Sequence, residues 1–167
     1  LISFLFLALI GGAGMVYELY SRVYQPNIVF SKDSSEKYIY IPTNSEFSDV
    51  VKVLSENGLL ININSFEWLA KQKKYDINVK SGRYKIDRAL NNNELVNLLR
   101  SGKQTPIRVT FNNLSKKEQL AGKIASQIEA DSASILDYIT DIIFQQKLAL
   151  TDDNVVCIFI PNTYEFY

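Results

Sequence analysis

The stretch from Gly82 to Phe111, GRYKIDRALNNNELVNLLRSGKQTPIRVTF, carries the signals that decide the fold. Asn91 and Glu94 have the spacing of a capping box, and leucines recur at helical spacing until Gly102 ends the pattern. Before Asn91 and after Gly102, apolar residues alternate with polar ones, as on a half-buried strand. The stretch therefore predicts a strand, a capped helix and a second strand.

The same pattern continues upstream and downstream of this stretch. Upstream we predict a strand at 38–41 that ends at Pro42, and two helices opened by the capping pairs Thr43 with Glu46 and Asn64 with Glu67. Downstream we predict a helix capped by Ser115 with Glu118, a second helix over 135–143, and a buried strand over 155–160. The chain is thus expected to be of the α+β class, with one small domain and the helical start of another.

The N-terminal stretch is apolar and uncharged up to Tyr17. At about 1.5 Å per residue such a helix nearly crosses a bilayer core, and Tyr17, Tyr20 and Tyr24 fit an interfacial aromatic belt. We therefore predict a transmembrane anchor over 1–24 and a linker over 25–37. A buried core helix and a cleavable signal peptide are the alternatives.

The composition excludes several kinds of site. The chain has 18 basic and 18 acidic side chains, which does not indicate a nucleic-acid binder. It has no histidine, so a Ser-His-Asp site or a zinc site with histidine ligands is excluded. Cys157 is the only cysteine and lies in an apolar run, so we expect it to be buried and unreactive. Seven basic residues between 71 and 88 are most simply a solvated face, and otherwise a weak attraction for an anionic polymer.

Three stretches together resemble the YceG-like endolytic murein transglycosylase family. They are the run from Ile41-Pro42 to Gly58-Leu59-Leu60, the run from Gly82 to Gly102, and Phe159-Ile160-Pro161-Asn162-Thr163-Tyr164-Glu165-Phe166. Their order and spacing agree with that family, as does the N-terminal anchor, and the resemblance spans nearly the whole chain.

This resemblance implies a single-pass protein of the inner membrane, with most of the chain in the periplasm. It implies a lyase that cuts glycan strands internally, between N-acetylmuramic acid and N-acetylglucosamine, and leaves 1,6-anhydro ends. One glutamic acid can first protonate the leaving oxygen and then, as a carboxylate, accept the proton of the attacking 6-hydroxyl. Residues 38–111 resemble a LysM-like glycan-binding subdomain, and 112–167 resemble the start of the catalytic domain. The partners implied are peptidoglycan strands, the membrane and cell-wall synthases, without a metal or cofactor.

The resemblance places the catalytic glutamate in an Ala-Ser-Ile-apolar-Glu-x-Glu motif beyond Tyr167, so we expect no catalytic residue in this chain and no activity from it alone. Glu129 lies in a similar run, but it precedes the Pro-Asn-Thr-Tyr stretch and belongs to an ordinary helix, so we expect it on the surface. Candidate substrate-binding residues are in the last stretch: Asn162, Tyr164, Glu165 and Tyr167, with the tyrosines stacking on sugar rings. For Glu165 the simpler expectation is a solvent-exposed charge.

A second class of function fits the same elements. A single-pass anchor followed by strand, two helices and strand also describes POTRA-like domains of non-enzymatic envelope scaffolds, which bind partner strands. A third possibility, docking of the basic run to anionic lipid, is the weakest, because the run has no apolar stripe beside it. The Pro-Asn-Thr-Tyr stretch favours the transglycosylase over the scaffold.

Overall fold

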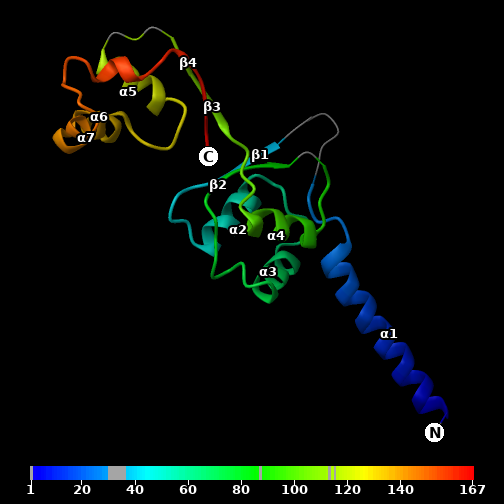
Figure 1. Cartoon of the computed structure of the whole chain (residues 1–167). Coiled ribbons are helices and arrows are strands. Elements are labelled where there is room, and N and C mark those ends of the chain that lie inside the picture. Colours follow the sequence, from blue (N-terminus) through cyan, green and yellow to red (C-terminus); the bar gives the residue numbers. More distant parts are fainter. Residues whose placement is uncertain (1, 30–36, 87, 113, 115) are drawn as a thin grey trace. The chain divides into compact units, whose positions relative to one another are not determined.

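A computed structural model describes residues 2–29, 37–86, 88–112, 114 and 116–167, with side chains from residue 10 onward (Figure 1). The chain divides into two compact units, Leu1–Thr105 and Pro106–Tyr167. Each is of mixed helix and strand composition, as the sequence predicts, and each contains one antiparallel pair of strands. We describe the two units separately.

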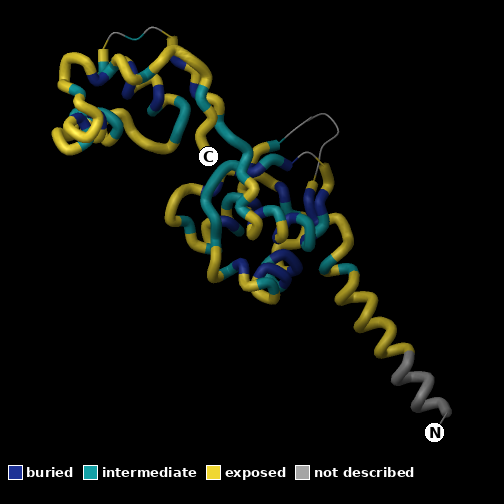
Figure 2. The backbone as a smooth tube through the Cα atoms, in the orientation of Figure 1, coloured by how far each residue is buried: buried dark blue, intermediate teal, exposed yellow. Residues whose placement is uncertain are grey.

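Unit 1 is built around a two-stranded ribbon. Its elements are α1 (Ile2–Tyr24), β1 (Lys37–Ile41), α2 (Phe47–Glu56), α3 (Ile63–Gln72), β2 (Gly82–Ile86) and α4 (Asn92–Ser101). Strands β1 and β2 are antiparallel, with Ile39 opposite Tyr84. Because side chains alternate across a strand, one face of the ribbon is apolar, and it packs with residues of α2, α3 and α4 in a single buried cluster (Figure 2).

Helix α4 forms as the sequence predicts. The Asn91 side chain accepts a hydrogen bond of 2.8 Å from the Glu94 amide, and the Glu94 carboxylate accepts one of 3.1 Å from the Asn91 amide. The Arg88 guanidinium contacts the same carboxylate at 2.8 Å. The hydrogen bond from Arg88, followed by the one from the Asn91 amide, lowers the pKa of the Glu94 carboxyl. Gly102 ends the helix with φ 70°, a left-handed conformation that glycine adopts without strain.

Two predicted helix starts are wrong by a few residues. Helix α2 is capped by Glu46 rather than Thr43, and α3 by Asn62 rather than Asn64. In the first case Asn44 is left-handed, with φ 62°, so a turn separates Thr43 from the helix. In the second case the Asn62 side chain reaches the Ser65 amide at 3.0 Å, which fixes the start two residues earlier. Ser115, the predicted cap of the next helix, lies outside the described residues.

The segment after α1 packs into unit 1, although the sequence predicts a linker over 25–37. Its Ile28 is buried in the core, and the amides of Asn27 and Ile28 donate to the Leu90 carbonyl at 3.0 and 3.1 Å. The Val29 amide donates to the Leu59 carbonyl at 2.8 Å. The remaining linker residues, 30–36, lie outside the described residues.

A buried polar network joins this segment to α1, α3 and α4. The Asn27 amide group donates to the Asn62 carbonyl at 2.9 Å and to the Asn92 side-chain oxygen at 2.7 Å. The Asn92 amide group in turn donates to the Ser65 hydroxyl at 2.9 Å and to the Arg22 carbonyl, in the last turn of α1, at 2.8 Å. These buried amides are satisfied by one another and by the main chain, so the end of α1 is held firmly on the domain.

Helix α1 is solvent-exposed over most of the part with described side chains (Figure 2). Among the described residues, no helix combines the length and the apolar character that a membrane crossing requires. Much of the predicted membrane segment falls on residues 1–9, whose side chains lie outside the description. The anchor over 1–24 stays a prediction.

Unit 2 has a smaller core. Its elements are β3 (Ile107–Phe111), α5 (Lys117–Ala125), α6 (Ser132–Thr140), α7 (Ile142–Lys147), the 3₁₀ helix η1 (Val155–Ile158) and β4 (Asn162–Phe166). Strands β3 and β4 are antiparallel, with Val109 opposite Tyr164. Val109, Phe111, Leu120 and Ile124 form the buried centre, against which Ile128 and Phe159 pack.

Three predictions for unit 2 are wrong. The helix predicted over 135–143 is broken at Asp141, which has extended backbone angles and caps α7 through the Phe144 amide at 2.8 Å. Within the apolar run 155–160, Val155–Ile158 form a 3₁₀ helix and no residue is in a strand, and only Val155 is buried. Cys157 is exposed, not buried. The strand that pairs with β3 is β4, which follows this run in the chain. Apolar composition alone therefore did not identify the strand.

Candidate functional site

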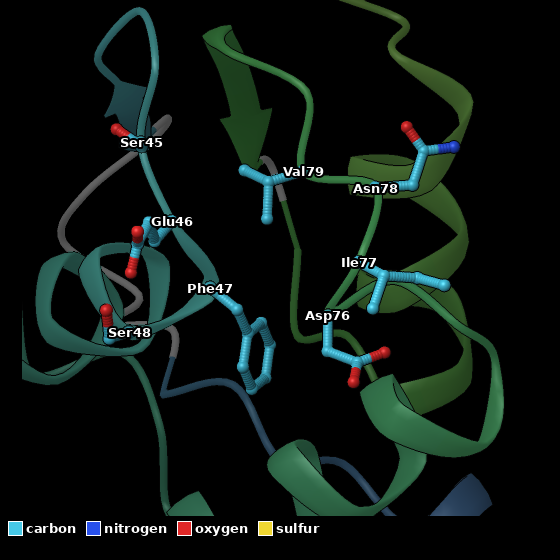
Figure 3. A pocket seen from close by; sticks show the side chains of 8 residues that line it. All are labelled: Ser45, Glu46, Phe47, Ser48, Asp76, Ile77, Asn78 and Val79. Atoms are coloured by element: carbon cyan, nitrogen blue, oxygen red, sulfur yellow. The ribbon is translucent and has the colours of Figure 1, made fainter.

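An open depression lies between the two loops that join the ribbon to the helices of unit 1 (Figure 3). One wall comes from the turn after β1 and the start of α2, and the other from the loop between α3 and β2. Its volume is about 540 Å³. The lining residues are Ser45, Glu46, Phe47, Ser48, Asp76, Ile77, Asn78 and Val79.

The first wall is fixed by hydrogen bonds at the start of α2. The Ser45 hydroxyl donates to the Pro42 carbonyl at 2.8 Å, which closes the turn after β1. The Glu46 amide donates to the Asp49 carboxylate at 2.8 Å, which satisfies one of the free amides at the helix start. This wall therefore presents its side chains from a defined backbone.

The second wall is held by tyrosines. Tyr75 is fully buried, and its carbonyl accepts a hydrogen bond of 3.0 Å from the Asn78 amide. The Tyr84 hydroxyl, from β2, donates to the carbonyl of Lys80 at 3.0 Å at the other end of the loop. The loop is thus fastened at both ends, while Ile77 between them is 79% exposed.

The Phe47 ring forms the floor of the depression (Figure 3). It stacks on Phe66 at 6.2 Å and meets Tyr75 edge-on at 6.1 Å, measured between ring centroids. Burial, together with the nearby Tyr84, raises the pKa of Tyr75, so this phenol stays neutral. Within the described part of the chain, the Tyr75 hydroxyl has no hydrogen-bond partner.

The lining combines the two kinds of group that carbohydrate binding uses. Glu46, Asp76 and the serine and asparagine side chains can hydrogen-bond hydroxyl and acetamido groups, and Phe47, Ile77 and Val79 offer apolar contact to ring faces. Across the described residues, no group of three or more Cys, Asp and Glu side chains could hold a metal ion. The lining of the depression is therefore suited to a chain that carries both polar groups and apolar faces.

The sequence-predicted site residues lie in β4 of unit 2, except Tyr167, which follows it, and Tyr164 and Glu165 are on opposite faces of the strand. The Tyr164 ring stacks on Phe111, with a centroid distance of 5.2 Å and an interplanar angle of 12°, and its hydroxyl donates to the Ile160 carbonyl. Glu165, next along the strand, is on the opposite face, where it accepts a 3.1 Å hydrogen bond from Arg108. Tyr167 is 81% exposed.

The Asn162 side chain is exposed, and its oxygen accepts from the Thr163 amide at 2.8 Å. Glu129 is exposed, as expected, but it lies after the end of α5 at Ala125, so the prediction that it belongs to a helix is wrong. Ile128 beside it packs against the core of unit 2. The substrate-binding assignment of Asn162, Tyr164, Glu165 and Tyr167 stays a prediction.

The sequence analysis did not identify the depression, because its two walls, residues 45–48 and 76–79, are far apart in the chain. The signal that could have found it is the pairing of the ribbon strands, because that brings the loop after β1 and the loop before β2 to the same end. A second signal is Ile77, an apolar residue between the polar Asp76 and Asn78.

The fold is α+β, and after α1 the first unit is a strand–helix–helix–strand module with the depression at one end of its ribbon. The sequence profile of the YceG-like family matches residues 39–167. This chain belongs to the YceG-like family.

Among solved structures, this chain is similar to a putative YceG-like protein from Listeria monocytogenes, with 22% sequence identity and a TM-score of 0.39. The match covers 80% of this chain and 49% of that one, so the chain spans about half the length of this relative. No curated protein matches the sequence.

Proposed function

We propose that this chain is the membrane-anchored, glycan-binding part of an endolytic peptidoglycan transglycosylase. The observation that carries the proposal is the family match over 39–167 together with the depression between the two loops of unit 1. In this proposal α1 lies in the cytoplasmic membrane, unit 1 acts as a LysM-like module in the periplasm, and the depression binds N-acetylated sugars of the glycan strand.

The whole enzyme cuts the bond between N-acetylmuramic acid and N-acetylglucosamine and leaves a 1,6-anhydro end. This reaction needs one carboxyl group that serves first as acid and then as base, at a pKa tuned by its surroundings. Glu129 and Glu165 are exposed, and Glu46 is part of a helix start. Because the resemblance to the family places the catalytic glutamate in its Ala-Ser-Ile-apolar-Glu-x-Glu motif, we assign the chemistry to that motif outside these 167 residues, and binding to the residues described here.

The chain alone should bind purified sacculi, and it should release no anhydro-ended fragments when the digest is analysed by mass spectrometry. A longer gene product that includes the downstream Ala-Ser-Ile-apolar-Glu-x-Glu motif should release them, and a Glu→Gln change in that motif should stop the release. Release that persists in this variant would contradict the mechanism.

The same assay separates the proposal from a scaffold role. A POTRA-like scaffold binds polypeptide strands and should not sediment with sacculi. If the detergent-solubilised chain stays in the supernatant while the sacculi sediment, the glycan-binding role has no support.

A further inference from the structure

The last turns of α1 and the start of α3 both expose apolar and aromatic side chains. Tyr17, Tyr20 and Tyr24 recur at spacings of three and four residues, so they share one face of α1, and all three are exposed. The rings of Tyr20 and Tyr24 are in contact, with centroids 5.1 Å apart. Ile61 and Ile63, at the start of α3, are exposed as well. We call these five residues, together with the exposed Val29, the junction surface.

Hydrogen bonds hold the start of α3 against the end of α1. The Ile61 amide donates to the Asn27 carbonyl at 2.9 Å, and the Asn62 amide donates to the Asn27 side-chain oxygen at 2.7 Å. The Asn92 side chain connects the Arg22 carbonyl to the same network. Helix α1 also contacts α3 and α4 (Figure 1). Ile61 is therefore fixed close to the end of α1, and it cannot move away without breaking these hydrogen bonds.

A small polar pocket lies within the junction. Its volume is about 210 Å³, and its lining includes Ser21, Arg22, Gln25, Ile61, Asn62 and Ser65. The Arg22 guanidinium is paired with the Glu18 carboxylate at 2.6 Å, so the two charges of these turns offset each other. Apolar groups thus lie beside uncharged polar groups and a neutralised ion pair. The boundary between lipid headgroups and acyl chains accommodates this mixture.

The position of the junction along α1 sets its depth in a bilayer. The sequence is uncharged up to Tyr17, and Glu18 is the first charged residue. At about 1.5 Å per residue, the stretch from Glu18 to Tyr24 spans about 9 Å, close to the roughly 5 to 8 Å of headgroup region on each side of a bilayer. Ile61 lines the same pocket as Ser21, one turn before the end of α1. With α1 in a membrane, Ile61 lies at the depth of that turn, in the headgroup region.

We infer that the junction surface docks on the phospholipid bilayer at the boundary between headgroups and acyl chains, so that unit 1 lies directly on the membrane. This inference rests on the proposed function, in which α1 is a membrane anchor. The tyrosines direct their rings to the acyl chains and their hydroxyls to the headgroups, and Ile61 and Ile63 add apolar area at the same level. A bilayer fits this surface better than a protein partner, because the surface is continuous with the helix that enters the lipid.

The test measures how deeply single residues lie in a bilayer. The full chain with Cys157→Ser, which removes the exposed native thiol, is inserted into nanodiscs of pure phospholipid. A nitroxide label is attached to one introduced cysteine at a time, at Ile61→Cys or Ile63→Cys. Ile77→Cys, in the exposed loop before β2, is the matched control, and Met15→Cys reports whether α1 itself is in the lipid. Collisions of each label with oxygen, which dissolves in lipid, and with a water-soluble nickel chelate give its depth.

The labels at Ile61→Cys and Ile63→Cys should collide with the nickel chelate at least about fivefold less often than the label at Ile77→Cys, because a polar chelate is excluded from the apolar layer. Their collisions with oxygen should be more frequent than those at Ile77→Cys. Ile61 is exposed, so the label fits without disturbing the core. Two label positions guard against a local effect of either substitution, and circular dichroism checks that each variant is folded.

The outcomes are distinguishable. If the label at Ile61→Cys meets the chelate as often as the label at Ile77→Cys, while Met15→Cys is in lipid, the inference is overturned and the anchor of the proposed function stands. A label at Met15→Cys that is itself in water would overturn both. Glycan binding is tested separately, by sedimentation with sacculi. Protection of Ile61→Cys in native membranes but not in pure lipid would overturn the lipid as the ligand and assign the surface to a membrane protein.

Discussion

The side-chain amide of Asn92, at the start of α4, donates a hydrogen bond of 2.8 Å to the carbonyl oxygen of Arg22 in the last turn of α1. The Asn92 side chain is 1% exposed and also binds Ser65 and Asn27. One residue therefore joins the end of α1 to the helices of unit 1. As a result, α1 and the rest of unit 1 are expected to move as one body.

Replacing Asn92 by Ala should destabilise the chain by about 2 to 3 kcal/mol, because Asn27 and Ser65 lose a buried partner. The amides of Asn27 and Ile28, which bind the Leu90 carbonyl, should exchange with deuterium at least about tenfold faster. Hydrogen exchange and urea unfolding measure the two effects. Asn57→Ala, at an exposed helix end, is the control, and equal exchange in both variants would argue against a rigid junction.

Ile77 is the most exposed apolar residue of the depression, and Ile77→Ser should reduce the affinity for N-acetylglucosamine oligomers by about threefold to tenfold. The fold should not change, since the side chain is outside the core. Fluorescence or calorimetric titration measures the affinity. Ile61→Ser, at an Ile that is 65% exposed outside the depression, is the matched control. An unchanged affinity in Ile77→Ser would remove the depression as the binding site.

The buried hydroxyl of Tyr75 gives a prediction on stability. Tyr75→Phe should stabilise the chain by about 1 kcal/mol, because it removes a polar atom that has no partner among the described residues. Tyr84→Phe is the control and should have the opposite sign, since the Tyr84 hydroxyl donates to the carbonyls of Lys80 and Ser81. Thermal unfolding at neutral pH compares them, and a destabilised Tyr75→Phe variant would show that the hydroxyl does have a partner.

The same residue predicts a pH dependence at high pH. The pKa of Tyr75 is raised above its usual value of 10.0, so its neutral form is favoured in the folded state. Its contribution is fully present below pH 10 and is lost as the pH rises above that value, because the unfolded tyrosine ionises first. Stability should therefore fall more steeply above pH 10 in the wild type than in Tyr75→Phe. Parallel curves would contradict the assignment.

The Glu94 carboxylate predicts that the stability of the chain depends on pH in the acid range. Its pKa is lowered below the usual 4.5, chiefly by the hydrogen bond from Arg88 and then by the Asn91 amide. The stabilisation is present above pH 4.5 and is lost as the pH falls through the lowered pKa. Glu94→Gln should cost about 0.5 to 1 kcal/mol at pH 7 and almost nothing at a pH below the lowered pKa of Glu94. Urea unfolding at both values measures this, with the exposed Glu56→Gln as control, and a cost that persists in acid would rule out the charge as its source.

Unit 2 allows one test of the predicted residues of β4. Tyr164→Ser should destabilise β3 and β4 by about 2 kcal/mol, because its ring packs on Phe111. Glu165→Gln should change stability by less than about 0.5 kcal/mol, since it loses only an exposed ion pair with Arg108. Hydrogen exchange of the Val109 amide reports on both. If Glu165→Gln reduced sacculus binding without changing exchange, its predicted role in substrate binding would gain support.

The sequence by itself determined the type and order of the elements in the stretch from Gly82 to Gly102, although it misplaced the starts of α2 and α3. The capping box of Asn91 and Glu94, the stop at Gly102 and the alternation in the two strands all act between near neighbours, so their spacing is sufficient. The family was also recoverable from sequence, because its motifs are short and ordered along the chain.

Only the tertiary structure decided the rest. The pairing of β1 with β2 brings two distant loops together as a depression. The burial of Asn27 with Asn92 turns a predicted linker into part of the domain. The apolar run 155–160 was predicted as a strand, but Val155–Ile158 form a 3₁₀ helix. Whether an apolar run forms a strand depends on contacts with distant residues. Contacts between residues far apart in the chain leave no periodicity in the sequence, and the proposed binding surfaces consist of such contacts.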